Sequence, residues 1–178
     1  MSGTSPEEIY RRVQELRRRY GRTEPVRLCE AMGILLLYAP MGTGRDACKG
    51  FYLTQSRKRA VTVNSDLPEP LQRVILAHEL GHAVLHRREA GVHGFRELRL
   101  FDETDRLEYE ANLFAAELLL EDGEVLSLME GEMSFFGTAA ALEVPPELLD
   151  YKFRALLRRG CQIGSPPLGA RSDFLRRI

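Results

Sequence analysis

The sequence predicts an α+β fold in which a small antiparallel sheet packs against one long buried helix, with further helices around it. Its 178 residues, of which 44% are hydrophobic and 29% charged, can bury one core without disulfides. Two short β-type segments joined by a polar turn indicate a hairpin, and residues 69–86 carry apolar side chains on nearly every side, as a buried helix does. These features predict one domain over residues 1–160.

Capping residues mark two helices at the start of the chain. Ser5 is followed by proline and two glutamates, which suits the first turn of an amphipathic helix over residues 5–20, and Gly21 suits its end. A shorter helix over residues 25–32 begins at another proline and closes at a glycine.

Strand signals follow these helices. The apolar run at residues 34–38 predicts a buried strand. Residues 50–54 and 59–64 predict the two strands of the hairpin, and the polar residues between them suit its turn. The buried helix over 69–86 then leads into a polar linker at residues 87–104.

The remainder of the chain is predicted to be helical. A strong helix is expected at residues 105–120, followed by one or two shorter ones. Two prolines open the last helix, over residues 147–159, and Gly160 ends it. Residues 161–178 contain several glycines and prolines with little to bury, so they are predicted to form a flexible, basic C-terminal tail.

Composition argues against several classes of protein. A net charge of −1 lacks the positive footprint of a nucleic-acid binder, so no direct nucleic-acid contact is expected. No apolar run approaches the roughly 20 residues of a membrane span, and the N-terminus lacks a signal-peptide core, which predicts a cytoplasmic protein. The three cysteines form no Cys-x-x-Cys pair and are expected to be free thiols. Residues 97–132 hold twelve acids against two arginines, which favours a substrate with a basic surface.

One motif carries the chemistry of a metal site. His78-Glu79-Leu80-Gly81-His82 matches His-Glu-x-x-His. Residues four apart in a helix lie on one face, so two imidazoles can converge on one zinc ion at roughly 2.0–2.1 Å each. Glu79 is then close to the metal and can take a proton from the attacking water and pass it to the leaving amine. The alternative is a pair of core histidines that are hydrogen-bonded to carbonyls or carboxylates.

A catalytic zinc needs a third protein ligand, and the helix over 105–120 offers several carboxylates. Helical phase places Glu108 on the packing side together with Asn112, whereas Glu110 is rotated by about 200°. Glu108 is therefore predicted to be the third ligand, and Asn112 to orient a ligating imidazole through a hydrogen bond. The other acids nearby are expected on solvated faces: Glu103, Glu110 and Glu117.

Two further residues on the motif helix have predicted roles. His86 lies one turn after His82, but three ligands from one straight helix would have to span about 12 Å, so it is expected to be a core or supporting residue. Gly81 costs about 1 kcal/mol relative to alanine inside a helix, so a neighbouring element is expected to approach closely there.

The two motifs together resemble a known family. The run from Leu76 to His82 and the later run from Glu108 to Leu119 look like those of the ImmA/IrrE family of metallopeptidases. The preceding hairpin, opened by Gly50, is also similar. One departure is that many relatives continue the Leu-Leu run with Met-Pro, where this chain has Leu120 and then two acids.

The resemblance implies a zincin-like metallopeptidase, a zinc endopeptidase that cleaves a regulatory protein, typically a helix-turn-helix repressor. It implies zinc binding by His78, His82 and Glu108, with Glu79 as the catalytic acid/base. Two other functions remain open at this point: a non-catalytic zinc-binding regulator, and a toxin–antitoxin component that acts by protein association. The sequence does not identify the individual substrate, its cleavage site, the inducing signal or the oligomeric state.

Overall fold

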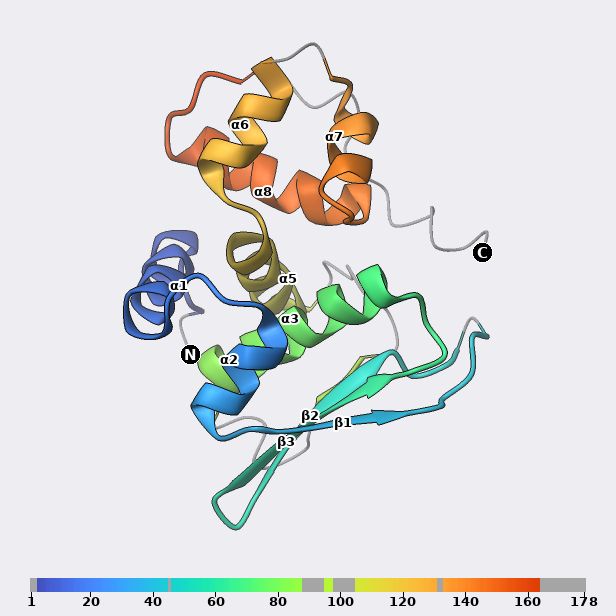
Figure 1. Cartoon of the computed structure of the whole chain (residues 1–178). Helices are drawn as coiled ribbons and strands as arrows, with labels where there is room; N and C mark the ends of the chain where they lie inside the picture. Colours follow the sequence, from blue (N-terminus) through green and yellow to red (C-terminus); the bar gives the residue numbers. More distant parts are fainter. Residues whose placement is uncertain (1–2, 45, 88–94, 98–104, 131–132, 164–178) are drawn as a thin grey trace.

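The computed structural model describes residues 3–44, 46–87, 95–97, 105–130 and 133–163. Helix α3 lies between a sheet on one side and helix α5 on the other, and α8 with its neighbours lies beyond α5 (Figure 1). In chain order the elements are α1 (Pro6–Tyr20), α2 (Pro25–Met32), β1 (Leu35–Ala39), β2 (Gly50–Gln55), β3 (Lys58–Asn64), α3 (Glu69–Leu85), β4 (Phe95–Glu97), α5 (Arg106–Leu119), α6 (Asp122–Glu130), α7 (Phe135–Ala141) and α8 (Pro146–Arg158). The predicted α+β class, zincin-like in its arrangement, is confirmed.

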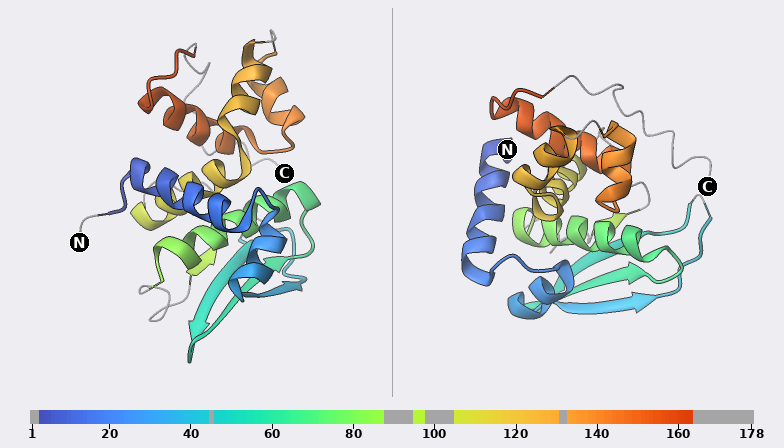
Figure 2. Two further views of the ribbon diagram at one scale, coloured as in Figure 1. Left: turned by 60° about the vertical axis from the view of Figure 1, so that its left-hand side comes forward. Right: turned by 45° about the horizontal axis from the view of Figure 1, so that its top comes forward.

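Local sequence signals account for the helix ends. Ser5 Oγ accepts a hydrogen bond from the Glu8 amide at 3.2 Å, and Gly21 ends α1 with φ 77°. Asp105 caps α5 in the same way, because its Oδ1 accepts from the Leu107 amide at 2.7 Å. Helix α1 then packs beside α5 at the edge of the helical layers (Figure 2).

The sheet is mixed rather than wholly antiparallel, which corrects one detail of the predicted fold. Its strand order is β1-β3-β2-β4, and the hairpin of β2 and β3 is antiparallel as expected. The two turn residues, Ser56 and Arg57, both have positive φ, as a two-residue type I′ hairpin turn requires. Strand β1, however, pairs in parallel with β3. Apolar runs mark where strands occur but not their direction.

Strand β1 is also more exposed than its apolar run predicted. Leu35 is 58% exposed and Leu37 is 45% exposed, although both were expected in a buried strand. The physical reason is position: β1 is an edge strand that pairs only with β3 among the described residues, so it packs against fewer neighbours than a central strand.

A fourth strand lies inside the stretch expected to be a linker. Residues 95–97 form β4, which pairs antiparallel with the start of β2. A three-residue strand carries too little pattern to be recognised in a sequence. The remaining residues of that linker, 88–94 and 98–104, lie outside the described residues, as does most of the predicted tail, 164–178. No helix in the described part of the chain is both long and apolar enough to cross a membrane.

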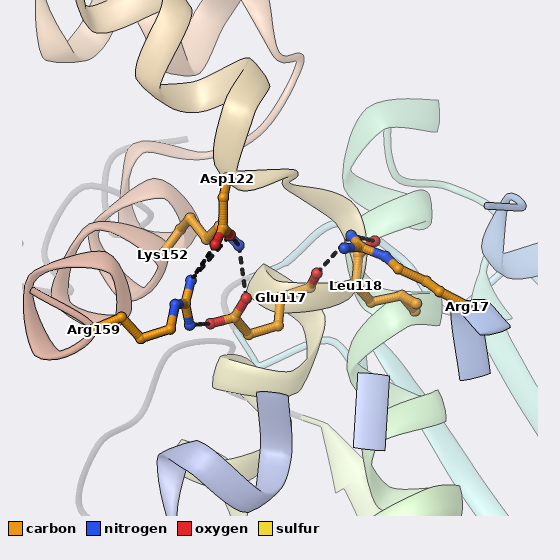
Figure 3. A network of polar contacts seen from close by, with 6 residues as sticks. All are labelled: Arg17, Glu117, Leu118, Asp122, Lys152 and Arg159. Carbon is orange, nitrogen blue, oxygen red and sulfur yellow. Dashed lines mark hydrogen bonds and ion pairs between the residues drawn. The ribbon is translucent and has the colours of Figure 1, made fainter. Parts of the chain in front are cut away.

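An ion network joins α8 to the end of α5 (Figure 3), and it consists of two buried residues, Glu117 and Lys152, and two partly exposed ones, Asp122 and Arg159. Lys152 has no exposed side-chain surface, and its Nζ lies 2.6 Å from Glu117 Oε2 and 2.5 Å from Asp122 Oδ1. Burial alone would raise the pKa of Asp122, but the hydrogen bond and charge of Lys152, and then of Arg159, lower it overall. The network thereby anchors α8 against the helix that carries Glu108.

Arg17 extends this attachment to the first helix. Its guanidinium donates to the backbone carbonyl of Glu117 at 2.9 Å and to that of Leu118 at 3.3 Å (Figure 3). These carbonyls belong to the last turn of α5, and Arg17 thereby satisfies two of its orphan acceptors. Helix α5 is thus held from both α1 and α8, and it also packs against α3.

Candidate metal centre

The two motif histidines face each other on α3. Residues Val74 to Ala83 of this helix are all buried, as the apolar pattern predicted. His78 and His82 have almost no exposed surface, and their Nε2 atoms lie 3.0 Å apart. Their rings are in an edge-to-face arrangement with centroids 4.7 Å apart. One turn of helix therefore aims two nitrogen donors at a single point.

Helix α5 brings a carboxylate to that point. Glu108 Oε2 lies 3.1 Å from His78 Nε2, and Oε1 lies 3.5 Å from His82 Nε2. The three residues form one group whose candidate ligand atoms all lie within 4.8 Å of one another. Four ligand atoms at about 2.0–2.1 Å from a tetrahedral zinc would be roughly 3.3 Å apart. The observed spacing of the three residues fits such an ion.

Gly81 allows α5 to come this close. A Cβ atom placed on Gly81 would lie 3.0 Å from Ala111 Cα and 3.2 Å from Ala111 O. The expected close approach of a neighbouring element is therefore confirmed, and the element is α5. Because the contact atoms belong to the backbone, they cannot move aside without shifting a helix.

We expect Gly81→Ala to lower the free energy of unfolding by about 1–2 kcal/mol, because overpacking costs more than alanine gains in helix propensity. Gly123→Ala is a matched control in α6, since a Cβ there would meet nothing within 4 Å. Its stability should stay constant or rise slightly. Urea unfolding of both variants measures the difference, and a stabilised Gly81→Ala protein would contradict the packing argument.

Glu79 is buried beside the two histidines and opposite the first residue of β2. A Cβ atom on Gly50 would lie 2.7 Å from Ile75 Cγ2 and 3.4 Å from Glu79 Oε1. Only glycine lets the backbone of β2 approach α3 so closely. The strand thus forms one wall beside the Glu79 carboxylate, whose side chain has no exposed surface.

Asn112 makes the contact expected of it. Its Oδ1 lies 2.9 Å from His78 Nδ1, and its Nδ2 lies 3.4 Å from the hydroxyl of Tyr151. Because Asn112 Oδ1 is an acceptor, the proton of a neutral His78 ring belongs on Nδ1, and the lone pair of the ring is then on Nε2. The contact therefore fits an imidazole whose Nε2 lone pair can bind a metal.

The surroundings of His82 also favour the form of the ring that can bind a metal. Burial lowers the pKa of His82 to about 4, and the hydrogen bond of Glu108 opposes this only in part. The imidazole is then neutral at pH 7. A neutral imidazole is the form that binds a metal ion.

Glu110 and Glu117 were expected on solvated faces, and both expectations were wrong. Glu110 is buried with its Oε2 3.0 Å from His86 Nε2, and the buried Glu117 belongs to the ion network. Helix α5 is buried on nearly all sides, so helical phase does not separate a wet face from a dry one. In the sequence, the apolar residues on either side of both acids were the available sign that these acids are buried. His86 is buried, as expected of a core or supporting residue.

Some of the acids between residues 97 and 132 have basic partners. Glu121 and Glu124, whose side chains are both partly exposed, pair with Arg22. The expected basic surface of the substrate stays a prediction. Glu103 lies outside the described residues.

The cysteines take no part in the cluster of possible metal ligands. All three are free thiols, as predicted: Cys29, Cys48 and Cys161. Cys48 Sγ donates to the Gly50 carbonyl at 3.2 Å, and burial raises the pKa of Cys29 to about 12.

Comparison with known proteins gives consistent matches. The pattern of the family described as the IrrE N-terminal-like domain, peptidase M78, matches residues 29–154. The chain is 34% identical over 140 residues to the protein named uncharacterized immunity region protein 2 of Bacillus phage phi105, covering 79% of this chain and 85% of that one. It is 30% identical over 148 residues to the metallopeptidase ImmA of Bacillus subtilis (strain 168), covering 81% of this chain and 83% of that one.

Proposed function

This chain belongs to the metallopeptidase family of the IrrE N-terminal-like domain, and from that premise we propose that it is a zinc-dependent endopeptidase. The family makes the chain a peptidase that depends on a metal. One observation supports the position of the metal: His78 Nε2, His82 Nε2 and the Glu108 carboxylate converge in a largely buried part of the protein. Two imidazoles and one carboxylate are a known ligand set of catalytic zinc, and three protein ligands leave a fourth position open.

Zinc held there would polarise a substrate carbonyl and make a water molecule more acidic. The protein supplies the proton transfers. Glu79, next to His78 on the helix, accepts the proton of the attacking water and delivers it to the nitrogen of the leaving amine. Its buried position beside Gly50 keeps bulk water from competing for that proton.

We expect His78→Ala and His82→Ala each to reduce the bound zinc, about one ion per chain in the wild type, to a small fraction, because each change removes a ligand. Glu69→Ala, an exposed residue on the same helix, is the control and should keep its zinc. Metal analysis after dialysis against a weak chelator provides the measurement. Full zinc content in both histidine variants would refute the assignment of the ligands.

For the substrate we propose a helix-turn-helix repressor that is cut in the cytoplasm. The support is the resemblance of the motif runs to the ImmA/IrrE family, together with relatives named as an immunity region protein and as ImmA. The test is incubation of the zinc-loaded protein with the helix-turn-helix repressor encoded beside it. We expect two defined fragments from one cut. A repressor that stays intact while an unrelated protein is cut would refute this choice of substrate.

A further inference from the structure

We propose that His86 and Glu110 are positioning residues that hold the His82 ring with its Nε2 toward the metal. The proposal rests on the proposed metal site. His82 Nδ1 lies 3.0 Å from His86 Nδ1, and His86 Nε2 lies 3.0 Å from Glu110 Oε2. All three side chains are almost fully buried, so these polar atoms depend on one another rather than on water.

With a metal on His82 Nε2 and Glu110 as the final acceptor, one arrangement of protons on the two neutral rings satisfies the whole chain of contacts. When His82 Nε2 turns its lone pair to a metal, the proton of the ring is on Nδ1. That N–H donates to His86 Nδ1, which must then be the unprotonated nitrogen of its ring. The His86 proton therefore lies on Nε2 and donates to Glu110 Oε2, which accepts it. Each donor in this chain has an acceptor, and the hydrogen bonds run in one direction, from His82 through His86 to Glu110.

The last member of the chain is itself anchored. Glu110 Oε1 accepts from the backbone N–H of Thr4 at 3.0 Å, and Arg106 Nε lies 3.4 Å from the same atom. The backbone before Thr4 lies directly against this carboxylate, because a Cβ on Gly3 would be 2.5 Å from Glu110 Oε1. Because both oxygens of Glu110 have partners, the carboxylate is fixed in position, and it in turn fixes the His86 ring.

The two histidines of the motif are therefore supported differently. His78 donates to the neutral amide of Asn112, whereas His82 reaches a carboxylate through a second imidazole. Partners of this kind fix the orientation of a ligating ring and raise its basicity, and their loss typically weakens metal binding by about 10–100-fold. His86 and Glu110 thus act on the metal through His82, without touching it.

The test compares zinc affinities measured by competition with a chromophoric chelator. His86→Phe keeps the ring volume and removes both nitrogens, so we expect zinc binding to weaken by about 10–100-fold. His86→Asn keeps an acceptor near the position of Nδ1 and should recover part of the loss. Glu110→Gln should weaken zinc binding more than Glu147→Gln, a change at a buried carboxyl on α8. In the cobalt-substituted protein, the visible spectrum should change in His86→Phe and return toward that of the wild type in His86→Asn.

A role limited to packing would give a different result. Then His86→Phe would bind zinc as tightly as the wild type, or both His86 variants would lose affinity equally, and either result would overturn the proposal. If His86→Phe does not fold, the proposal would be overturned by equal zinc affinities of Glu110→Gln and Glu147→Gln. Failure of the metal site itself is recognised separately, because the wild type and His78→Ala would then bind zinc equally weakly.

Discussion

Glu79→Gln is expected to slow peptide-bond cleavage by about 10²–10⁴-fold, the usual contribution of a general acid/base. The amide has nearly the shape of the carboxylate, so the contact with Gly50 and the buried surroundings are preserved. It has no basic oxygen that can take the proton from water. The loss should therefore appear in the rate at saturating substrate.

Three measurements make this result specific. Zinc content and the melting temperature of Glu79→Gln should match those of the wild type, and Glu69→Gln, an exposed change on the same helix, should keep full activity. Cleavage at the wild-type rate in Glu79→Gln would assign the base elsewhere. Binding of the repressor without any cut, by the wild type and the variant alike, would favour the non-catalytic regulator or the toxin–antitoxin component.

Lys152→Met is expected to be the most destabilising of the changes considered, at about 3–5 kcal/mol of unfolding free energy. Methionine fills similar space but leaves two carboxylates, the buried Glu117 and the partly exposed Asp122, with Arg159 as their one positive partner in the network. Removing one member of a buried ion pair exposes the desolvation cost of the other. Domains are stable by only about 5–15 kcal/mol, so a large fall in melting temperature should follow.

The controls separate burial from charge. Lys58→Met removes an exposed lysine and should change stability by less than about 0.5 kcal/mol. Adding Glu117→Gln to Lys152→Met should restore part of the loss, because the excess negative charge disappears and Asp122 and Arg159 form a balanced pair. A cost below about 1 kcal/mol for Lys152→Met alone would show that the network contributes little.

The network also predicts a loss of stability in acid. The folded pKa of Asp122 lies below its ordinary value of 3.8, so its contribution is fully present above that value. The contribution is lost as the pH falls through the folded pKa. Equilibrium unfolding between pH 5 and pH 2, at roughly half-unit steps, should therefore show a steeper decline in the wild type than in a protein with Asp122→Asn.

Relations between residues close in the chain were predictable from the sequence. The cap at Ser5, the turn between β2 and β3, and the shared face of His78 and His82 each depend on a few neighbouring positions. Helical phase also chose Glu108 over Glu110 as the acid nearer the two histidines, and the distances agree with that choice.

Relations between distant segments were decided only by the tertiary structure. The sequence pattern did not reveal that β1 pairs in parallel with β3 at an exposed edge of the sheet. Nor did it reveal that Glu110 contacts the Thr4 amide and the His86 ring. Phase tells which residues of one helix share a face, but whether that face meets water depends on what packs there. Helices from three other parts of the chain pack around α5, so Glu110, an acid that looked solvated, is a buried partner of His86.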